Sequence, residues 1–313
     1  MRILHRFKGL YTQFFGLVDN IMISTTPLKA PTKAIEYLNK YTYVLDNVQK
    51  IETSDKYQNK IWQLWFQGED KMPPIVKACT DSVKYYHKDD VIMLTYDNLT
   101  DYIELPDYII EKHKKGIIPH ANLSDMVRAT LLSKYGGCWV DSTIYLTGRI
   151  PDDILNADFF AFRSYNCDTY RRIESYDEFK MYSNYFREPM SVESPYFIES
   201  KAGGDIMNCI LALFLEYWKY ENHVVDYLMI DKFFNMVLIN KKELRKQFLE
   251  MPTYYIPDVL LLSDALFEHF DQKTLDFIKK ASNVHKLTHK NLKRSPFKDS
   301  FLEYLINTPA DKV

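Results

Sequence analysis

The chain has 313 residues, of which 46% are hydrophobic and 26% charged, a balance typical of a globular protein with a core of its own. Its formal net charge of -2 excludes the basic surplus of a dedicated nucleic-acid binder, so we expect no nucleic-acid partner. The four cysteines form no CxxC pair, which argues against a disulfide framework or a sulfur-bound metal and favours reduced, mostly buried thiols.

The start of the chain predicts an amphipathic helix. Apolar side chains over residues 3–22 recur at three- and four-residue spacing, and basic residues lie near the start of this stretch. Such a helix packs on its own domain, on a second subunit or in a membrane interface. Polar residues interrupt the apolar stretch and no cleavage site follows, so secretion is not supported. No apolar run reaches the length of a membrane span. We therefore expect a cytoplasmic protein, with residues 1–24 as the candidate contact with the inner face of the plasma membrane.

Periodicity and turn residues predict the elements that follow. In chain order these are a helix over residues 32–52, a strand over 61–66, a loop over 68–74, a helix over 75–86 and a strand over 91–95. The clearest helix spans residues 119–135 and is followed by strands over 138–146 and 159–162, a polar insertion over 167–189 and a strand over 194–200. Helices over residues 205–220, 227–239 and 241–250 precede a largely helical tail over 258–313. Strand, helix and strand in this order are typical of a parallel sheet.

Polar residues that suit catalysis follow one another around the Gly136-Gly137 pair. Asp125 and Arg128 are three residues apart, so both project from the same side of the predicted helix. Alternation along the next predicted strand places Trp139, Asp141 and Thr143 on one face. Ligands of open α/β sheets bind at the carboxyl ends of the strands, which is where these groups would meet.

Transfer of a sugar from a nucleotide needs groups of these kinds. The leaving diphosphate must be neutralised, which a carboxylate-bound divalent ion does, and an arginine pairs with phosphate or orients a carboxylate. Each residue also has a structural interpretation by itself, with Asp141 as a turn former, Asp125 as part of a helix cap and Arg128 as a surface ion-pair partner. Their order along the predicted helix and strand favours a transferase site.

These residues resemble a known family. The pattern Ser124-Asp125-x-x-Arg128, followed by Gly136-Gly137-x-x-x-Asp141-Ser142-Thr143, resembles the capsular polysaccharide synthesis proteins. That family is similar to the DxD-type sugar transferases of glycosyltransferase family 32. The resemblance extends to residues 61–65, 225–234 and 285–290, so it covers most of the chain.

The resemblance implies a GT-A fold, which is an α/β fold with a Rossmann-like, mostly parallel sheet flanked by helices. We expect residues 1–45 to form the N-terminal amphipathic helical segment. Residues 46–313 would form the GT-A domain, with a C-terminal helical tail.

The resemblance also implies roles for individual residues. The expected catalytic residues are Asp125, Arg128 and Asp231. The expected donor-binding residues are Trp62, Gln63, Tyr96, Asp125, Arg128, Ser142 and Lys286. The expected ligands of Mn²⁺ or Mg²⁺ are Asp141, Thr143 and His285. Thr143 stands where a full DxD motif has a second carboxylate, which weakens the metal site.

The function implied is the transfer of a hexose, glucose or galactose, from a UDP-sugar to a lipid-linked capsular or exopolysaccharide glycan, with retention of configuration. Two alternatives stay open. One is a non-catalytic relative that binds saccharide or scaffolds a polysaccharide-assembly complex, and the other is a transferase that glycosylates protein. A homo-oligomer is compatible with the sequence.

Overall fold

The computed structural model describes residues 33–162, 195–290 and 298–313. The predicted helix over residues 3–22 and the predicted insertion over 167–189 lie outside these residues. The helix expected over 32–52 is present in a different form, as a short helix α2 (Lys33–Leu38) followed by a 3-10 helix (Asn39–Asn47). Its side chains Ile35, Leu38, Tyr41 and Leu45 are buried in the main core. The division of the chain at residue 45 stays a prediction.

A five-stranded sheet forms the centre of the molecule, in the order β2-β1-β3-β6-β5. Its strands are β1 (Ile61–Leu64), β2 (Val91–Leu94), β3 (Gly137–Val140), β5 (Phe159–Ala161) and β6 (Phe197–Ser200). β1 runs parallel to β2 and β3, whereas β6 runs antiparallel to both of its neighbours. Four strands therefore point the same way, which confirms the expected α/β fold with a mostly parallel sheet.

The strand expected over residues 138–146 is in fact two strands. The chain turns after Val140, and β4 (Ile144–Leu146) leaves the central sheet to pair with β7 (Val284–Lys286) in a separate antiparallel ribbon. The prediction that Asp141 and Thr143 share the face of one continuous strand is therefore wrong. Hydrogen bonds in the turn, such as Ile144 N to the Asp141 carbonyl at 2.9 Å, end the extended conformation there.

Helices cover both faces of the sheet. They are α3 (Pro74–His87), α4 (Asp107–Lys114), α5 (His120–Lys134), α6 (Asp152–Leu155), α9 (Asp205–Tyr220), α10 (Met229–Asn240), α11 (Lys242–Glu250), α12 (Ile256–Ala265), α13 (Gln272–Ala281) and α14 (Phe301–Asn307). The predictions for α3, α5, α9, α10 and α11 are confirmed with only small shifts at their ends. α4 has no counterpart among the predicted elements, and α6 lies between the predicted strands over residues 138–146 and 159–162.

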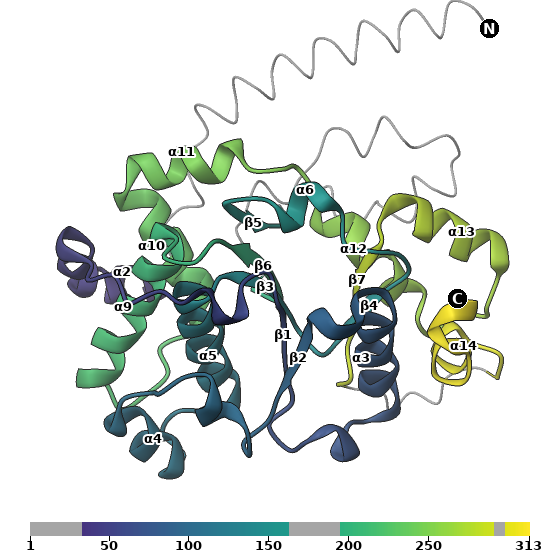
Figure 1. Ribbon diagram of the computed structural model, residues 1–313, viewed down its shortest axis with the longest axis horizontal. Coiled ribbons are helices and arrows are strands. Elements are labelled where there is room, and N and C mark those ends of the chain that lie inside the picture. The colour runs from purple at the N-terminus through teal and green to yellow at the C-terminus, as the bar shows by residue number, and fades with distance from the viewer. Residues whose placement is uncertain (1–32, 163–194, 291–297) are drawn as a thin grey trace, which may run out of the picture.

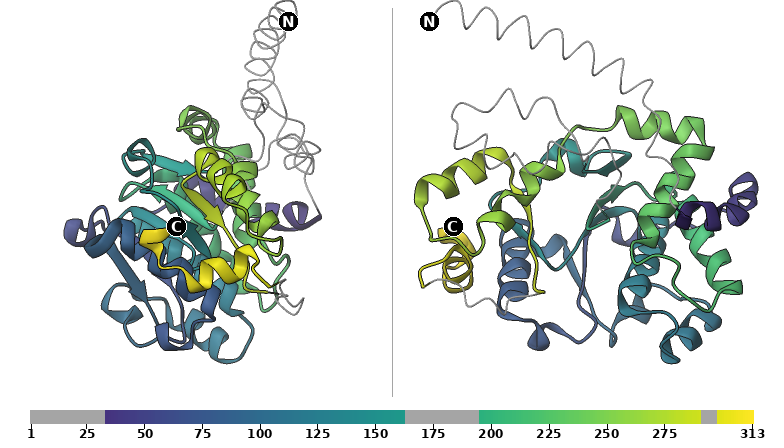
Figure 2. Two further views of the ribbon diagram at one scale, coloured as in Figure 1. Left: turned by 90° about the vertical axis from the view of Figure 1, so that its right-hand side faces the viewer. Right: turned by 180° about the vertical axis from the view of Figure 1, so that it is seen from behind.

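The molecule has three layers (Figure 1). α5, α9 and α10 pack on one face of the sheet, against Trp62, Trp139 and Ile198. α3, α12 and the β4–β7 ribbon pack on the other face, against side chains such as Ile61 and Val140. Figure 2 shows α13 and α14 beside α3, on the opposite side of the molecule from α2.

The structure also bears on the predictions about membrane spans and cysteines. Within the described ranges, no helix is long and apolar enough to cross a membrane. Cys79, Cys138 and Cys209 are free and buried, as the sequence predicts, and Cys167 lies outside the described residues.

Candidate functional site

The Gly136-Gly137 pair joins α5 to β3 and sets their relative position. Gly137 has φ +88°, and a Cβ there would lie 2.2 Å from the Lys60 carbonyl oxygen at the start of β1. The Gly136 carbonyl accepts a hydrogen bond of 2.9 Å from the indole nitrogen of Trp62. Only glycine allows this backbone conformation and this close approach of two strands. The pair therefore directs β3 alongside β1, so that both strands end at the same edge of the sheet.

The turn after β3 presents Asp141 at that edge. The Asp141 amide donates to the Tyr196 carbonyl at 2.9 Å, and Ser142 Oγ donates to the Leu64 carbonyl at 2.8 Å. These bonds attach the turn to the ends of β6 and β1. Ser142 is buried in this role, whereas the Asp141 side chain is 25% exposed. Asp141 is thus a fixed carboxylate with an open side.

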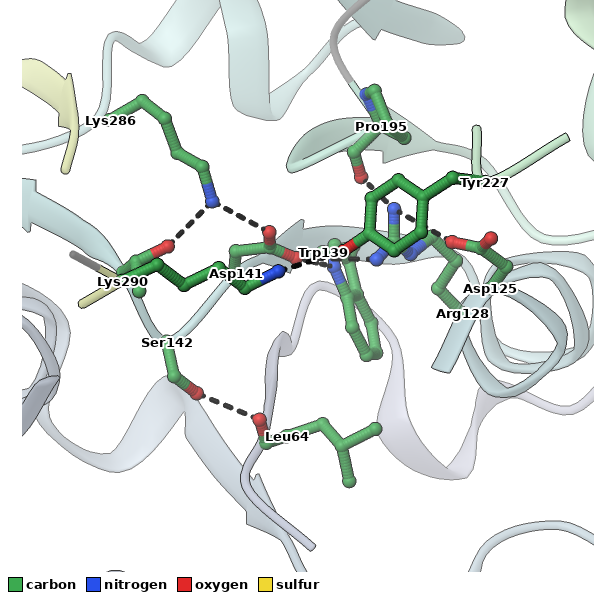
Figure 3. A network of polar contacts seen from close by, with 11 residues as sticks. Leu64, Asp125, Arg128, Trp139, Asp141, Ser142, Pro195, Tyr227, Lys286 and Lys290 are labelled. Atoms are coloured by element: carbon green, nitrogen blue, oxygen red, sulfur yellow. Dashed lines mark hydrogen bonds and ion pairs between the residues drawn. The ribbon is translucent and has the colours of Figure 1, made fainter. Parts of the chain in front are cut away.

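Arg128 of α5 connects two carboxylates (Figure 3). Its Nη2 donates to Asp141 Oδ1 at 3.3 Å, and its Nη1 lies 3.5 Å from Asp125 Oδ1. Nη1 also donates to the Pro195 carbonyl. The side chains of Arg128 and Asp125 are 6% and 9% exposed. The helical spacing of three residues predicts that these two side chains share one side, and the structure confirms this.

Trp139 completes the contacts around Asp141. Its indole nitrogen donates to Asp141 Oδ1 at 2.9 Å, and its ring lies below the Arg128 guanidinium, 4.8 Å from its carbon to the ring centroid. A cation over an indole face is attracted by the ring quadrupole. Trp139 therefore holds both partners of the Arg128–Asp141 pair in place.

Lys286 reaches Asp141 from the opposite side. The β4–β7 ribbon pairs Lys286 with Ile144, so that Lys286 lies beside the turn. Its Nζ lies 2.8 Å from Asp141 Oδ2 and 2.5 Å from Thr143 Oγ1, and Figure 3 shows it directed at the carboxylate. We refer to Asp125, Arg128, Asp141 and Lys286 as the Asp141 cluster.

The two carboxylates of the cluster differ in protonation. Burial is the main reason why the pKa of Asp125 is raised to about 7; Arg128 opposes this shift and Asp141 adds to it. Burial also raises the pKa of Asp141, but Lys286 and Arg128 outweigh it, so this pKa lies below its ordinary value. At neutral pH, Asp141 is therefore the anion that balances the cations, while Asp125 exchanges a proton.

The structure corrects the prediction that His285 is a metal ligand. Neighbouring side chains of a strand point to opposite sides, and Lys286 is the one that meets Asp141. His285 is fully buried, with its Nε2 2.9 Å from Thr147 Oγ1. Burial lowers its pKa to about 3, so its ring is a neutral core group.

Asp141 and Thr143 alone do not fit a divalent ion in this arrangement. Asp141 Oδ1 accepts from Arg128 and Trp139, and Oδ2 and the Thr143 hydroxyl both accept from Lys286. The described residues contain no group of three or more His, Cys, Asp or Glu side chains that could hold a metal. The position beside Asp141 and Thr143 is occupied by an ammonium.

Aromatic side chains line the same edge of the sheet beyond β1 and β2. Tyr96 is 43% exposed and stacks on Phe66, with 4.6 Å between the ring centroids. Its hydroxyl lies 2.8 Å from His113 Nε2, and the ring of His120, at the start of α5, lies 6.1 Å away. Tyr96 is therefore an oriented ring with an open side.

Three other predicted site residues lie inside the protein. Trp62 is fully buried among Tyr57, Tyr102 and Tyr135, and the only polar atom of its side chain donates to the Gly136 carbonyl. Gln63 is buried within β1, where its amide has no hydrogen-bond partner among the described residues. Asp231 is buried in the first turn of α10. The structure thus brings together Asp125, Arg128, Asp141, Ser142, Thr143 and Lys286, and it does not show Trp62, Gln63 or Asp231 among their contacts.

Sequence reasoning assigned no role to Trp139 or to the Pro195 carbonyl. The contact of Trp139 with Asp141 could have been predicted, because alternation along the strand places both side chains on the same face. The position of Pro195 follows from the antiparallel pairing of β6 with β3, which no local pattern predicts.

The match to a protein family agrees with the sequence pattern. The chain matches the family described as capsular polysaccharide synthesis protein over residues 28–305. No curated protein matches it. A solved structure described as PaToxG glycosyltransferase aligns with 90% of this chain and 94% of that chain, at 13% identity and a TM-score of 0.37.

Proposed function

The chain belongs to the capsular polysaccharide synthesis protein family, and from this premise we propose that it is a glycosyltransferase that uses a sugar nucleotide. The observation that carries the proposal is the Asp141 cluster at the carboxyl edge of the parallel strands β1 and β3. Ligands of α/β sheets bind at this edge. A carboxylate held between two cations there suits a substrate with both hydroxyls and phosphates.

The residues of the Asp141 cluster differ in how far their side chains are exposed, which suggests different roles. Asp141 and Lys286 are 25% and 22% exposed, so both are open to a ligand, whereas Arg128 is 6% exposed. Lys286 would bind the diphosphate and Asp141 would accept from hydroxyl groups of the donor. Arg128 would act as a positioning residue that fixes Asp141 and Asp125. Rigid charges of this kind stabilise a transition state without reorganising when charge develops.

The nucleobase would stack on Tyr96. The ring has an open side, is held by Phe66 and His113, and belongs to the loop that follows β2, next to β1 in the sheet. Stacking on an aromatic ring is a common way to bind a base. In contrast, Trp62 has no exposed surface to offer, and its contacts favour a role in the core.

The finer assignment rests on the family. We propose glucose or galactose as the transferred hexose, UDP as the carrier, retention of configuration, and a lipid-linked capsular or exopolysaccharide glycan as the acceptor. The reaction would take place at the inner face of the plasma membrane. Asp231 as a catalytic residue and residues 1–24 as the membrane contact remain part of this proposal.

A screen of UDP-glucose, UDP-galactose and their N-acetyl forms tests the proposal, with donor hydrolysis and transfer to lipid-linked glycan as readouts. The Asp141→Asn variant should lose turnover, whereas Asp158→Asn, which breaks an exposed ion pair with Lys201, should keep it. Failure to bind or turn over any sugar nucleotide, with or without added divalent ions, would reject the proposal. Binding without turnover would favour a non-catalytic relative, and sugar found on protein alone would favour a protein acceptor.

A further inference from the structure

The ammonium of Lys286 bridges Asp141 and Thr143, two of the residues that the family resemblance predicts as metal ligands. It lies between Asp141 Oδ2, at 2.8 Å, and Thr143 Oγ1, at 2.5 Å, which are the first and third residues of the Asp-Ser-Thr turn. These two contacts use the oxygens that a metal would need. Lys286 is therefore placed as a cation in its own right.

Several contacts hold Lys286 there. Its backbone belongs to β7, where it pairs with Ile144, and the next residue, Leu287, donates from its amide to the Thr143 carbonyl at 2.9 Å. Its Nζ also lies 5.2 Å from the ring centroid of Tyr196. The pairing of β7 with β4 and the bond from Leu287 to the turn thus fix the backbone of Lys286 beside Asp141.

Charge balance explains the threonine in the motif. A divalent ion between two carboxylates is neutralised by them, whereas an ammonium needs only one carboxylate. Asp141 provides that one, and Thr143 provides a neutral oxygen in place of the second carboxylate. Arg128 is the second cation beside Asp141, and it also lies 3.5 Å from Asp125. A divalent ion added beside Asp141 would lie close to the ammonium, and like charges at such a distance repel strongly in a partly buried site.

We propose that Lys286 neutralises the leaving diphosphate in place of a divalent metal ion, so that donor binding and transfer do not depend on a metal. This inference rests on the proposed function. In the transfer, the bond between the sugar C1 and the diphosphate oxygen breaks, and its electron pair stays on the diphosphate. The acceptor hydroxyl oxygen forms the new bond to C1, and its proton passes to the leaving diphosphate. Lys286 stabilises the charge that develops on the leaving oxygen.

The test compares the unmodified full chain in excess chelator with the same protein in added Mn²⁺ or Mg²⁺. UDP affinity is measured by calorimetry, and donor turnover is measured in parallel. We expect both quantities to agree within about twofold between the two conditions, because the cation is part of the chain. Loss of UDP binding or turnover in chelator, with recovery on adding Mn²⁺, would overturn the inference.

The Lys286→Met variant removes the charge and keeps most of the side-chain volume. We expect it to weaken UDP binding and lower turnover by about 100-fold, while uridine, which has no phosphate, binds as before. The matched control is Lys84→Met, since Lys84 is an ion-paired lysine of α3 with its Nζ 2.6 Å from Glu69 Oε1. Equal losses of UDP and uridine affinity would show that Lys286 has only a structural role and would overturn the inference.

The experiment separates two failures. Metal-dependent turnover would overturn the role of Lys286 and leave the glycosyltransferase intact. Absence of binding and turnover under every cation condition would instead reject the proposed function. Thermal unfolding of both variants checks that they fold. If Lys286→Met does not fold, the comparison of the unmodified protein in chelator and in added metal still tests the inference.

Discussion

Arg128 and Asp141 lie 3.3 Å apart, and this contact joins helix α5 to the turn after β3. The two residues reach the site from different layers of the fold, since α5 packs on one face of the sheet and Asp141 follows a strand within it. Trp139 contacts both of them. The buried guanidinium of Arg128 thus links α5 to the carboxylate at the edge of the sheet.

Replacement of Arg128 by lysine should show that the planar guanidinium is needed and not only its charge. One ammonium cannot bind Asp125, Asp141 and the Pro195 carbonyl and also stack on Trp139. We expect the free energy of unfolding to fall by about 2 kcal/mol in urea denaturation, and donor turnover to fall with it. Arg149→Lys is the control, because Arg149 is exposed and donates only to the Tyr86 carbonyl among the contacts observed. Similar losses in both variants would contradict the prediction.

Asp125 should make stability depend on pH in a defined direction. Its pKa is raised from 3.8 in a free chain to about 7 in the folded protein, mainly by burial. Between these values the folded state binds more protons than the unfolded state, so this group's contribution to stability is full below about pH 4 and is lost as the pH rises towards 7.

The Asp125→Asn variant stays neutral at every pH, so its stability relative to the unmodified protein should improve as the pH rises through this range. We expect the difference between their free energies of unfolding to change by about 3 kcal/mol between pH 4 and pH 7, because each unit of the pKa shift contributes about 1.4 kcal/mol. Denaturation at several pH values measures it, with the exposed Asp101→Asn variant as the control. A difference that does not vary with pH would show that Asp125 has an ordinary pKa.

Gly137→Ala should destabilise the protein far more than Gly116→Ala. Both residues have positive φ, +88° and +72°, so both substitutions strain the backbone. At Gly137 the added Cβ would also lie 2.2 Å from the Lys60 carbonyl oxygen, whereas nothing lies within 4 Å of it at Gly116. We expect a loss of about 1 kcal/mol for Gly116→Ala and about 4 kcal/mol or more for Gly137→Ala. Equal melting temperatures for the two variants would exclude the clash between β3 and β1.

Tyr96→Ala should weaken the binding of uridine and UDP by about tenfold or more, because it removes the stacking surface. Tyr96→Phe should retain most of the affinity, since the ring on Phe66 is preserved. The control is Tyr85→Ala, which removes an exposed tyrosine of α3. Calorimetry with uridine tests the base contact apart from the phosphates. Unchanged affinity for uridine in Tyr96→Ala would place the base elsewhere.

The local patterns of the sequence predict much of the fold and the part of the site that lies on α5. The spacing of Asp125 and Arg128 and the stop at Gly136-Gly137 depend on contacts within a few residues, so periodicity and turn chemistry predict them. The break after Val140 was missed because both halves of the stretch are apolar and rich in branched residues. Which of two sheets each half joins depends on partners elsewhere in the chain.

The sequence by itself determined the family, the mostly parallel sheet and the position of Asp125 and Arg128 on one side of a helix. Only the tertiary structure decided that Lys286, and not His285, faces Asp141, from which it is separated by 145 residues. The pairing of β7 with β4 sets this choice, because side chains alternate along a strand and a shift of one residue would exchange the two. Such a register depends on packing between distant segments, which no local pattern specifies.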